Sequence, residues 1–286
     1  MSKFTDWVIS HIGHYLNKET GAKKAYLTDF DSLSYEIRPA DVLLVEGTNH
    51  ISTTIRHVTN SPWTHAALYI GRLHDIDDPA LRAKIQEHYI GPPDSQLLIE
   101  SMLGEGTVVT PLAQYRNNHA RICRPQGLMR QDAQKIIGYV INRLGQRYSL
   151  RHIIDLYRFL IPYSILPRRW RSSLFMSHAS LPTEDICSSM IAHAFTSVHF
   201  PILPIVRKDS HRKALQLIRR NPRIFVPSDF DYSPYFSIIK YPLFNISVQQ
   251  AYKNLPWEQN LMGINEDEIY EVNDESSNKN TNEEDS

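Results

Sequence analysis

The chain has 286 residues, of which 42% are hydrophobic and 22% charged, a composition typical of a folded globular protein. It contains no uncharged apolar run of about 18 residues, so no transmembrane helix is predicted. Its first residues lack the basic start, apolar centre and small-residue cleavage site of a secretory signal, so no signal peptide is predicted. The two cysteines, Cys123 and Cys187, cannot form a disulfide framework, which favours a reducing cytoplasmic location and leaves open one bridge between them.

The net charge of zero conceals an uneven distribution of charge. Residues 265–286 hold nine acidic residues and one lysine, a net charge of −8, so residues 1–264 carry +8. A basic body with an acidic tail is typical of proteins that bind an anionic partner, and equally of a solvated surface with a solubilising tail. Because the tail has little apolar surface to bury, we expect residues 265–286 to be disordered.

The first predicted element is a helix over residues 3–17, where aromatic and aliphatic residues recur on one helical face. It is expected either to pack on the body or to lie in a membrane interface. Residues 18–38 are polar and predict a connector, so that residues 1–38 form an N-terminal helix and connector.

Five apolar segments bounded by turn residues predict strands in the next part of the chain. They cover residues 41–46, 64–71, 96–100, 106–110 and 120–124. Helices are expected over residues 50–58 and 77–89, and an amphipathic helix over residues 128–144.

The later chain is predicted to be mainly helical. Helices are expected over residues 151–160, 184–195 and 208–219, an apolar and basic insertion over 161–175, and extended pieces over 224–229 and 236–239. Strands followed by helices, without regular alternation, indicate an α+β fold. The predicted domain covers residues 39–246, followed by an extension over 247–264.

Cys187 is placed where a thiolate is favoured. Pro182 and Thr183 give a helix start signal, which puts Cys187 in the first helical turn. Unpaired backbone N–H groups and the helix dipole favour an anion there, although neighbouring acidic residues oppose it. The pattern leaves two interpretations open, a nucleophile and a buried structural cysteine.

Two further residues stand at the ends of predicted strands with chemistry that suits a thiol nucleophile. His65 begins one strand and could act as the base, unless it is a structural histidine. Glu100 ends an apolar strand and could orient the imidazole, unless it points to water. Their convergence with Cys187 in space is a hypothesis at this stage.

These residues lie in motifs that resemble those of a known family. The motifs are LLVEG at 43–47, SPWTHAALYIG at 61–71, IES at 99–101, TVVTPL at 107–112, DICSS at 185–189, PSD at 227–229 and SPYF at 233–236. In this order they resemble the NlpC-type papain-like cysteine hydrolases, and within them the circularly permuted YiiX/YebB-like branch. The stretch from serine-proline-tryptophan to His65 is the most specific part, and the resemblance covers about residues 39–240.

The resemblance implies a papain-like, circularly permuted antiparallel sheet with the nucleophile helix packed against it. It implies Cys187 as the nucleophile, His65 as the base and Glu100 as the orienting residue, in the order that the permuted branch requires. The implied activity is that of a cysteine hydrolase or acyltransferase acting on an amide, ester or thioester through an acyl-enzyme. The other class of function is a catalytically inactive papain-like module that binds a membrane or protein partner.

Two aromatic residues are weaker candidates for substrate binding. Trp63 could wall the pocket or belong to the core, and Tyr148 could contact substrate or pack internally. No metal site is predicted, because no histidine pair has ligand spacing with a following carboxylate. No cofactor is expected.

The expected partners are an acyl or peptide substrate and an anionic membrane surface. Residues 143–171 carry seven arginines against the single acid Asp155, interleaved with aromatic residues, and residues 208–223 add a second basic block that begins with Lys208. The alternative is a connector whose arginines meet the acidic tail. The resemblance extends to lecithin:retinol acyltransferase-like enzymes, which makes a lipid ester an expected substrate beside a peptide amide. Nucleic acid is not expected, because no recognition motif is present.

Overall fold

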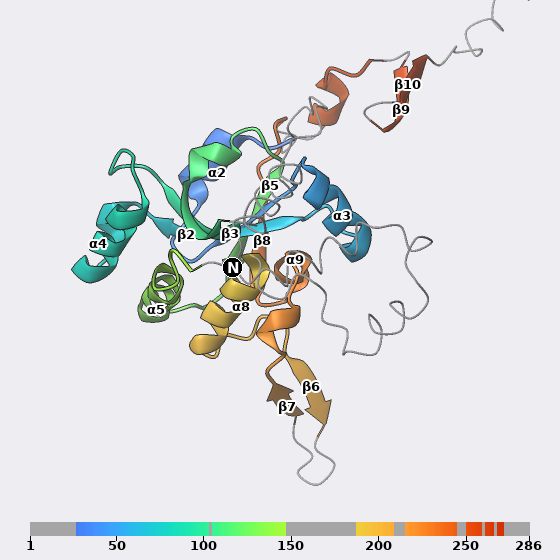
Figure 1. Cartoon of the computed structure of the whole chain (residues 1–286). Coiled ribbons are helices and arrows are strands. Elements are labelled where there is room, and N and C mark those ends of the chain that lie inside the picture. Colours follow the sequence, from blue (N-terminus) through green and yellow to red (C-terminus); the bar gives the residue numbers. More distant parts are fainter. Residues whose placement is uncertain are drawn as a thin grey trace, which may run out of the picture.

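The computed structural model describes residues 27–102, 105–146, 187–208, 215–244, 250–258, 261–265 and 268–271. Its centre is a six-stranded antiparallel sheet with the strand order β4-β3-β2-β1-β5-β8 (Figure 1). The strands are β1 (Val42–Val45), β2 (His65–Gly71), β3 (Leu97–Met102), β4 (Gly106–Pro111), β5 (Ala120–Pro125) and β8 (Phe236–Ile239). Strand β8 brings a late part of the chain to the sheet edge beside β5.

The apolar pattern of each strand follows from its place in the sheet. Strand β1 lies between β2 and β5, and all four of its residues are buried, which explains its uninterrupted apolar run. Strand β2 has six buried residues after His65, which is half-buried at the start of the strand. The predicted α+β class with an antiparallel sheet is confirmed, and all five strands predicted between residues 41 and 124 are present.

Helices cover both faces of the sheet. Helices α4 (Pro79–His88), α5 (Arg130–Ile141) and α8 (Cys187–Ser197) contribute to the larger hydrophobic core. Helix α2 (Phe30–Glu36) and the 3-10 helix η2 (Leu112–Tyr115) pack on the opposite face with the smaller core (Figure 1). Because side chains alternate along a strand, Ala66 and Leu68 of β2 face the larger core while Ala67 and Tyr69 face the smaller one.

Helix α8 is the most buried helix among the described residues, with eight buried positions. Its Phe195 ring contacts Phe200, Phe230 and Phe236 at centroid distances of 5.3, 6.4 and 5.3 Å. At the other end, Ser188 Oγ donates a 2.7 Å hydrogen bond to the carbonyl oxygen of Phe225. These contacts fix the helix and hold its first turn against the sheet.

The smaller elements connect these layers. Helix α3 (His50–Thr59) confirms the helix predicted over 50–58, with the Asn49 side chain accepting from the Ser52 N–H at its start. The others are η1 (Leu73–Asp75), η3 (Pro222–Ile224), α9 (Ser228–Tyr232) and η4 (Ala251–Asn254), and two hairpins, β6 (Ile205–Lys208) with β7 (Leu215–Ile218) and β9 (Leu261–Asn265) with β10 (Glu268–Glu271). Within the described residues, no helix has the length and apolar character needed to cross a membrane.

Four predictions of local structure are wrong. The polar connector contains α2, because Phe30, Leu33 and Ile37 bury one face against the sheet. The basic helix expected over 208–219 is replaced by the strands β6 and β7, whose cross-strand pairing could not be seen from local periodicity. The extended piece expected over 224–229 instead contains the start of α9, and the predicted disordered tail begins within the β9–β10 hairpin.

Several predictions lie outside the described residues. They are the helices over 3–17 and 151–160, the insertion over 161–175, Tyr148, and the acidic residues beyond 271.

Candidate active site

The site begins with His65 at the first position of β2. Val45 of β1 pairs with His65 in the sheet register, and the preceding Thr64 accepts a 2.9 Å hydrogen bond from the Gly47 N–H. This turn fixes the direction in which β2 starts. The His65 side chain is 18% exposed, so it lies at the edge of the site rather than inside the core.

Glu100 lies inside β3, with no exposed surface, and its strand continues to Met102. The alternative that Glu100 points to water is therefore wrong. Its Oε2 atom bonds to His65 Nε2 and also accepts a hydrogen bond from the Tyr115 hydroxyl. Because Nε2 of the imidazole is occupied in this way, Nδ1 is the ring nitrogen that remains for a third group.

Cys187, the first residue of α8, is that third group. Cys187 is 4% exposed, and its sulfur interacts electrostatically with the His65 side chain and with the backbone N–H groups of Ala66 and Ser188. Helix α8 packs on the face of the sheet opposite Tyr115 and α2, so the thiol and the carboxylate reach the imidazole from different sides. The three residues converge although they are far apart in the chain.

The electrostatics of this cluster favour an ion pair. Burial alone would raise the pKa of Cys187, but the adjacent His65 outweighs it and holds the pKa of the thiol below its ordinary value. Burial alone would lower the pKa of His65, but the charges of Cys187 and Glu100 outweigh it and raise that pKa well above its ordinary value. Shifts in these opposite directions favour a thiolate paired with an imidazolium.

The carboxylate side of the cluster is arranged to keep Glu100 ionised. Burial would raise the pKa of Glu100, but the imidazolium of His65 outweighs it and lowers that pKa. Burial and the Glu100 charge together raise the pKa of Tyr115 well above its ordinary value, so its hydroxyl remains a donor. The Tyr115 ring also stacks on the His65 ring, with centroids 6.1 Å apart.

Tyr115 is the residue of this site that sequence reasoning missed. It lies in η2, directly after the strand β4 that pairs with β3. The chain has 15 tyrosines, and no spacing distinguishes this one from the others. Only the pairing of β3 with β4 brings its hydroxyl to Glu100.

Cys123 is in a different environment from Cys187. It lies in β5 with no exposed surface, and burial raises the pKa of its thiol far above the ordinary value. Both cysteines are free, so the disulfide that the sequence left open is not formed.

The two aromatic candidates have different outcomes. Trp63 is 2% exposed, stacks on His119 with centroids 5.4 Å apart, and lies 4.3 Å from the Arg121 guanidinium carbon. This environment supports the core interpretation of Trp63 rather than a pocket wall. Tyr148 lies outside the described residues.

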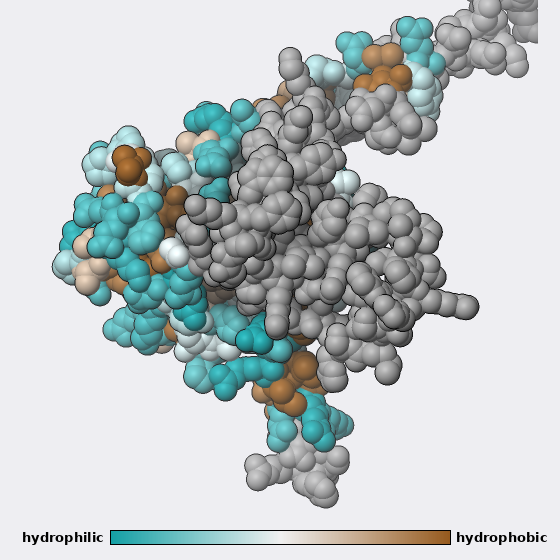
Figure 2. All heavy atoms as spheres, in the orientation of Figure 1, coloured by the Kyte–Doolittle hydropathy of each residue, from teal (hydrophilic) through white to brown (hydrophobic). Residues whose placement is uncertain are grey.

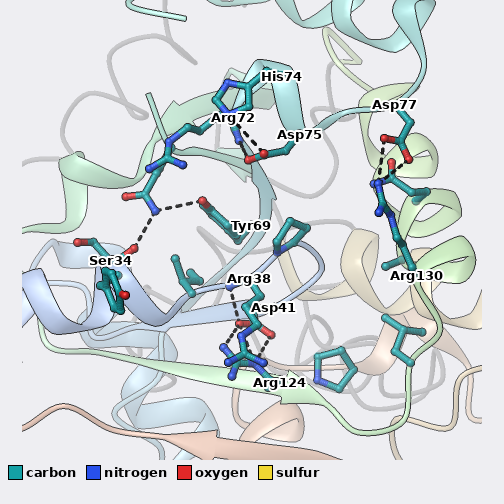
Figure 3. A pocket seen from close by; sticks show the side chains of 18 of the residues that line it. Ser34, Arg38, Asp41, Tyr69, Arg72, His74, Asp75, Asp77, Arg124 and Arg130 are labelled. Carbon is teal, nitrogen blue, oxygen red and sulfur yellow. Dashed lines mark hydrogen bonds and ion pairs between the residues drawn. The ribbon is translucent and has the colours of Figure 1, made fainter. Parts of the chain in front are cut away.

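A separate polar hollow of about 860 Å³ lies at the other end of β2, where Tyr69 lines it (Figure 3). Its charged side chains already pair with one another: Arg124 with Asp41 at 2.9 Å, and Arg130 with Asp77 at 3.2 Å. None of Cys187, His65 and Glu100 lines this hollow. We therefore take the group of these three residues, and not the hollow, as the candidate active site. Among the described residues, no group of three or more His, Cys, Asp or Glu side chains could hold a metal ion.

Comparison with known proteins gives limited information. No protein-family model and no curated protein sequence matches the chain. Among solved structures, the chain is similar to the metalloprotein YiiX from Escherichia coli O157:H7, with 11% sequence identity and a TM-score of 0.41. The similarity covers 71% of this chain and 97% of that one. At this level of similarity, the assignment of function depends on the geometry of the cluster.

Proposed function

We propose that this protein is a cysteine hydrolase or acyltransferase that acts on an amide, ester or thioester. The observation that carries the proposal is the contact between Cys187 and His65, with Glu100 bonded to the far side of the same imidazole. The opposite pKa shifts of the thiol and the imidazole are those that a thiolate nucleophile and its acid–base partner need.

The proposed reaction has two stages. In the first, the Cys187 thiolate attacks the carbonyl carbon and the carbonyl electrons move to oxygen; collapse then expels the leaving amine, alcohol or thiol, which takes a proton from the His65 imidazolium. In the second, His65 removes a proton from water or another acceptor, which attacks the thioester. The acyl group leaves with the acceptor, and the Cys187 thiolate and the His65 imidazolium are restored.

The other residues support these steps. The backbone N–H of Cys187 is the candidate donor to the developing oxyanion, because the first turn of a helix presents N–H groups without helical partners. Glu100 fixes the orientation of the imidazole and stabilises its charged form. Tyr115 acts as a positioning residue that holds the carboxylate of Glu100.

The fold we propose for this activity is a circularly permuted papain-like one. The antiparallel sheet with α8 packed against it supports the proposal, as does the chain order of His65, Glu100 and Cys187. The proposed substrates are a lipid ester or a peptide amide, since the motifs resemble a group that includes lipid acyltransferases.

Acyl-enzyme trapping tests the proposal. The protein is incubated with activated esters, thioesters and amides of fatty and amino acids, and the acyl adduct is located by mass spectrometry. We expect an adduct on Cys187 that is absent from Cys187→Ala and retained in Cys123→Ala. The absence of an adduct on Cys187, with every probe and at every pH tested, would favour the inactive binding module.

A further inference from the structure

The hairpin of β6 and β7 exposes large apolar side chains on both of its strands. It projects away from the sheet and its helices (Figure 1), and all eight residues of its strands are exposed. Five of them are large and apolar: Ile205 (51% exposed), Val206 (58%), Leu215 (73%), Leu217 (59%) and Ile218 (41%). An isolated two-stranded hairpin is marginally stable in water, so this one needs a surface that covers it.

The apolar side chains occupy both faces of the hairpin. Val206 pairs with Leu217, and Ile205 pairs with Ile218 at the neighbouring position. Because successive residues of a strand point to opposite faces, these two pairs lie on opposite sides of the ribbon. Figure 2 shows apolar side chains exposed where the hairpin leaves the body.

The hairpin is also basic. The described residues in 205–208 and 215–223 include five basic side chains and no acidic one. They are Arg207, Lys208, Arg219, Arg220 and Arg223. Arg220 lies 3.9 Å from Asp229, whereas Arg207, Lys208 and Arg219 are exposed on or next to the strands.

We propose that the β6–β7 hairpin docks the protein on an anionic phospholipid bilayer, with its apolar side chains inserted among the acyl chains and its basic side chains at the lipid phosphates. A folded protein partner would cover one face of the ribbon and leave the other exposed to water. A bilayer interface surrounds both faces, and its negative surface potential matches the basic side chains. The exposed apolar pairs on both sides therefore favour lipid over protein.

This inference stands apart from the proposed chemistry. The hairpin contains none of His65, Glu100 and Cys187, so hairpin variants are expected to leave the reaction of Cys187 with a small soluble ester unchanged. Loss of vesicle binding with intact acylation would concern docking alone, and loss of acylation with intact vesicle binding would concern the chemistry alone.

Co-sedimentation of the full chain with vesicles tests the proposal. We expect binding to phosphatidylcholine vesicles that contain phosphatidylserine, weaker binding in high salt, and little binding to phosphatidylcholine alone. Val206→Asp/Leu217→Asp and Ile205→Asp/Ile218→Asp are each expected to lower binding by about 10-fold or more, because each removes apolar side chains from one face and adds two negative charges.

A matched control separates the loss of the hairpin's apolar side chains from the effect of two added negative charges. Ile90→Asp/Met129→Asp changes two exposed apolar residues elsewhere, 103% and 64% exposed, and is expected to retain binding. Thermal unfolding of each variant is expected to match the wild type, since the substituted side chains are exposed. Absence of wild-type binding to anionic vesicles, or unchanged binding in either hairpin variant, would overturn the proposal.

Discussion

Cys187 and Cys123 are buried to almost the same extent, at 4% and 0% exposure, yet their surroundings move the pKa of each thiol in opposite directions. Cys123 lies in β5, where burial raises the pKa of its thiol and the charge of Arg121 is too weak to offset that rise. Burial also raises the pKa of Cys187, but His65, together with the backbone N–H groups of Ala66 and Ser188, more than offsets it. The difference shows that the groups beside a buried thiol, and not its burial alone, decide the direction in which its pKa moves.

The largest expected effect on turnover comes from removing His65, the partner of Cys187. His65→Ala removes both the charge that lowers the pKa of Cys187 and the acid–base group, so acyl transfer is expected to fall on the order of 1,000-fold or more. Turnover of the best substrate found in the trapping assay measures this. His74→Ala, which alters a histidine with a 60% exposed side chain, is the control and is expected to keep full activity. Equal rates for His65→Ala and wild type would exclude His65 as the base.

Glu100→Gln is expected to have the next largest effect, a fall in turnover on the order of 100-fold. The amide keeps the shape but removes the charge that raises the pKa of His65, so that pKa falls toward its ordinary value. Because His65 must be protonated in the first stage, the alkaline limb of the rate profile is expected to move to lower pH. An unshifted alkaline limb would contradict the role of Glu100, and Glu87→Gln on the surface is the matched control.

Tyr115→Phe is expected to lower turnover by about 3- to 10-fold, the cost of losing one hydrogen bond of about 1 kcal/mol. Without this donor the Glu100 carboxylate is held less firmly, so the decrease should fall mainly on kcat and be accompanied by a small shift of the alkaline limb. Tyr232→Phe, at a position 81% exposed, is the control. A lower melting temperature with an unchanged rate and pH profile would make Tyr115 a packing residue only.

Cys123→Ala is expected to have the smallest effect on activity, and it tests the other cysteine of the comparison. It leaves a small cavity in β5 and is expected to lower the free energy of unfolding by about 1–2 kcal/mol. Turnover and its pH profile should be unchanged, because Cys123 contributes to the core and not to the cluster. Denaturant unfolding together with an activity assay checks both parts. A loss of turnover in the folded variant would show that the two cysteines are not separate in function.

The sequence predicted the strands of the central sheet well, but it did not predict the β6–β7 hairpin or α2. Strands buried on both faces, such as β1, are continuous apolar runs that can be recognised without knowing their neighbours. The β6–β7 hairpin depends on cross-strand pairing that the periodicity of a single segment does not show, and its basic composition resembled that of a surface helix. Helix α2 could have been found, because Phe30, Leu33 and Ile37 have helical spacing and Asp29 caps the first turn.

For the site, the sequence located residues at the ends of elements but not their contacts. Cys187, His65 and Glu100 were found as candidates because a predicted helix start and two predicted strand ends carry reactive side chains. The structure brings these three together, with Glu100 inside β3 rather than at its end. Their catalytic roles stay predictions. Tyr115 could not be found, because its contact with Glu100 exists only through the pairing of β3 with β4.

The most direct test is a pH titration of thiolate absorbance in the ultraviolet, taken as the difference between wild type and Cys187→Ala, because it needs no reagent to enter the site. We predict that the Cys187 thiolate forms at a pH below the value of about 8.5 for a free cysteine. In the His65→Ala background the same difference should titrate at a clearly higher pH, since burial is then opposed only by the backbone N–H groups of Ala66 and Ser188. A thiolate that titrates at or above the free value in the wild type, or at the same pH with and without His65, would contradict the account.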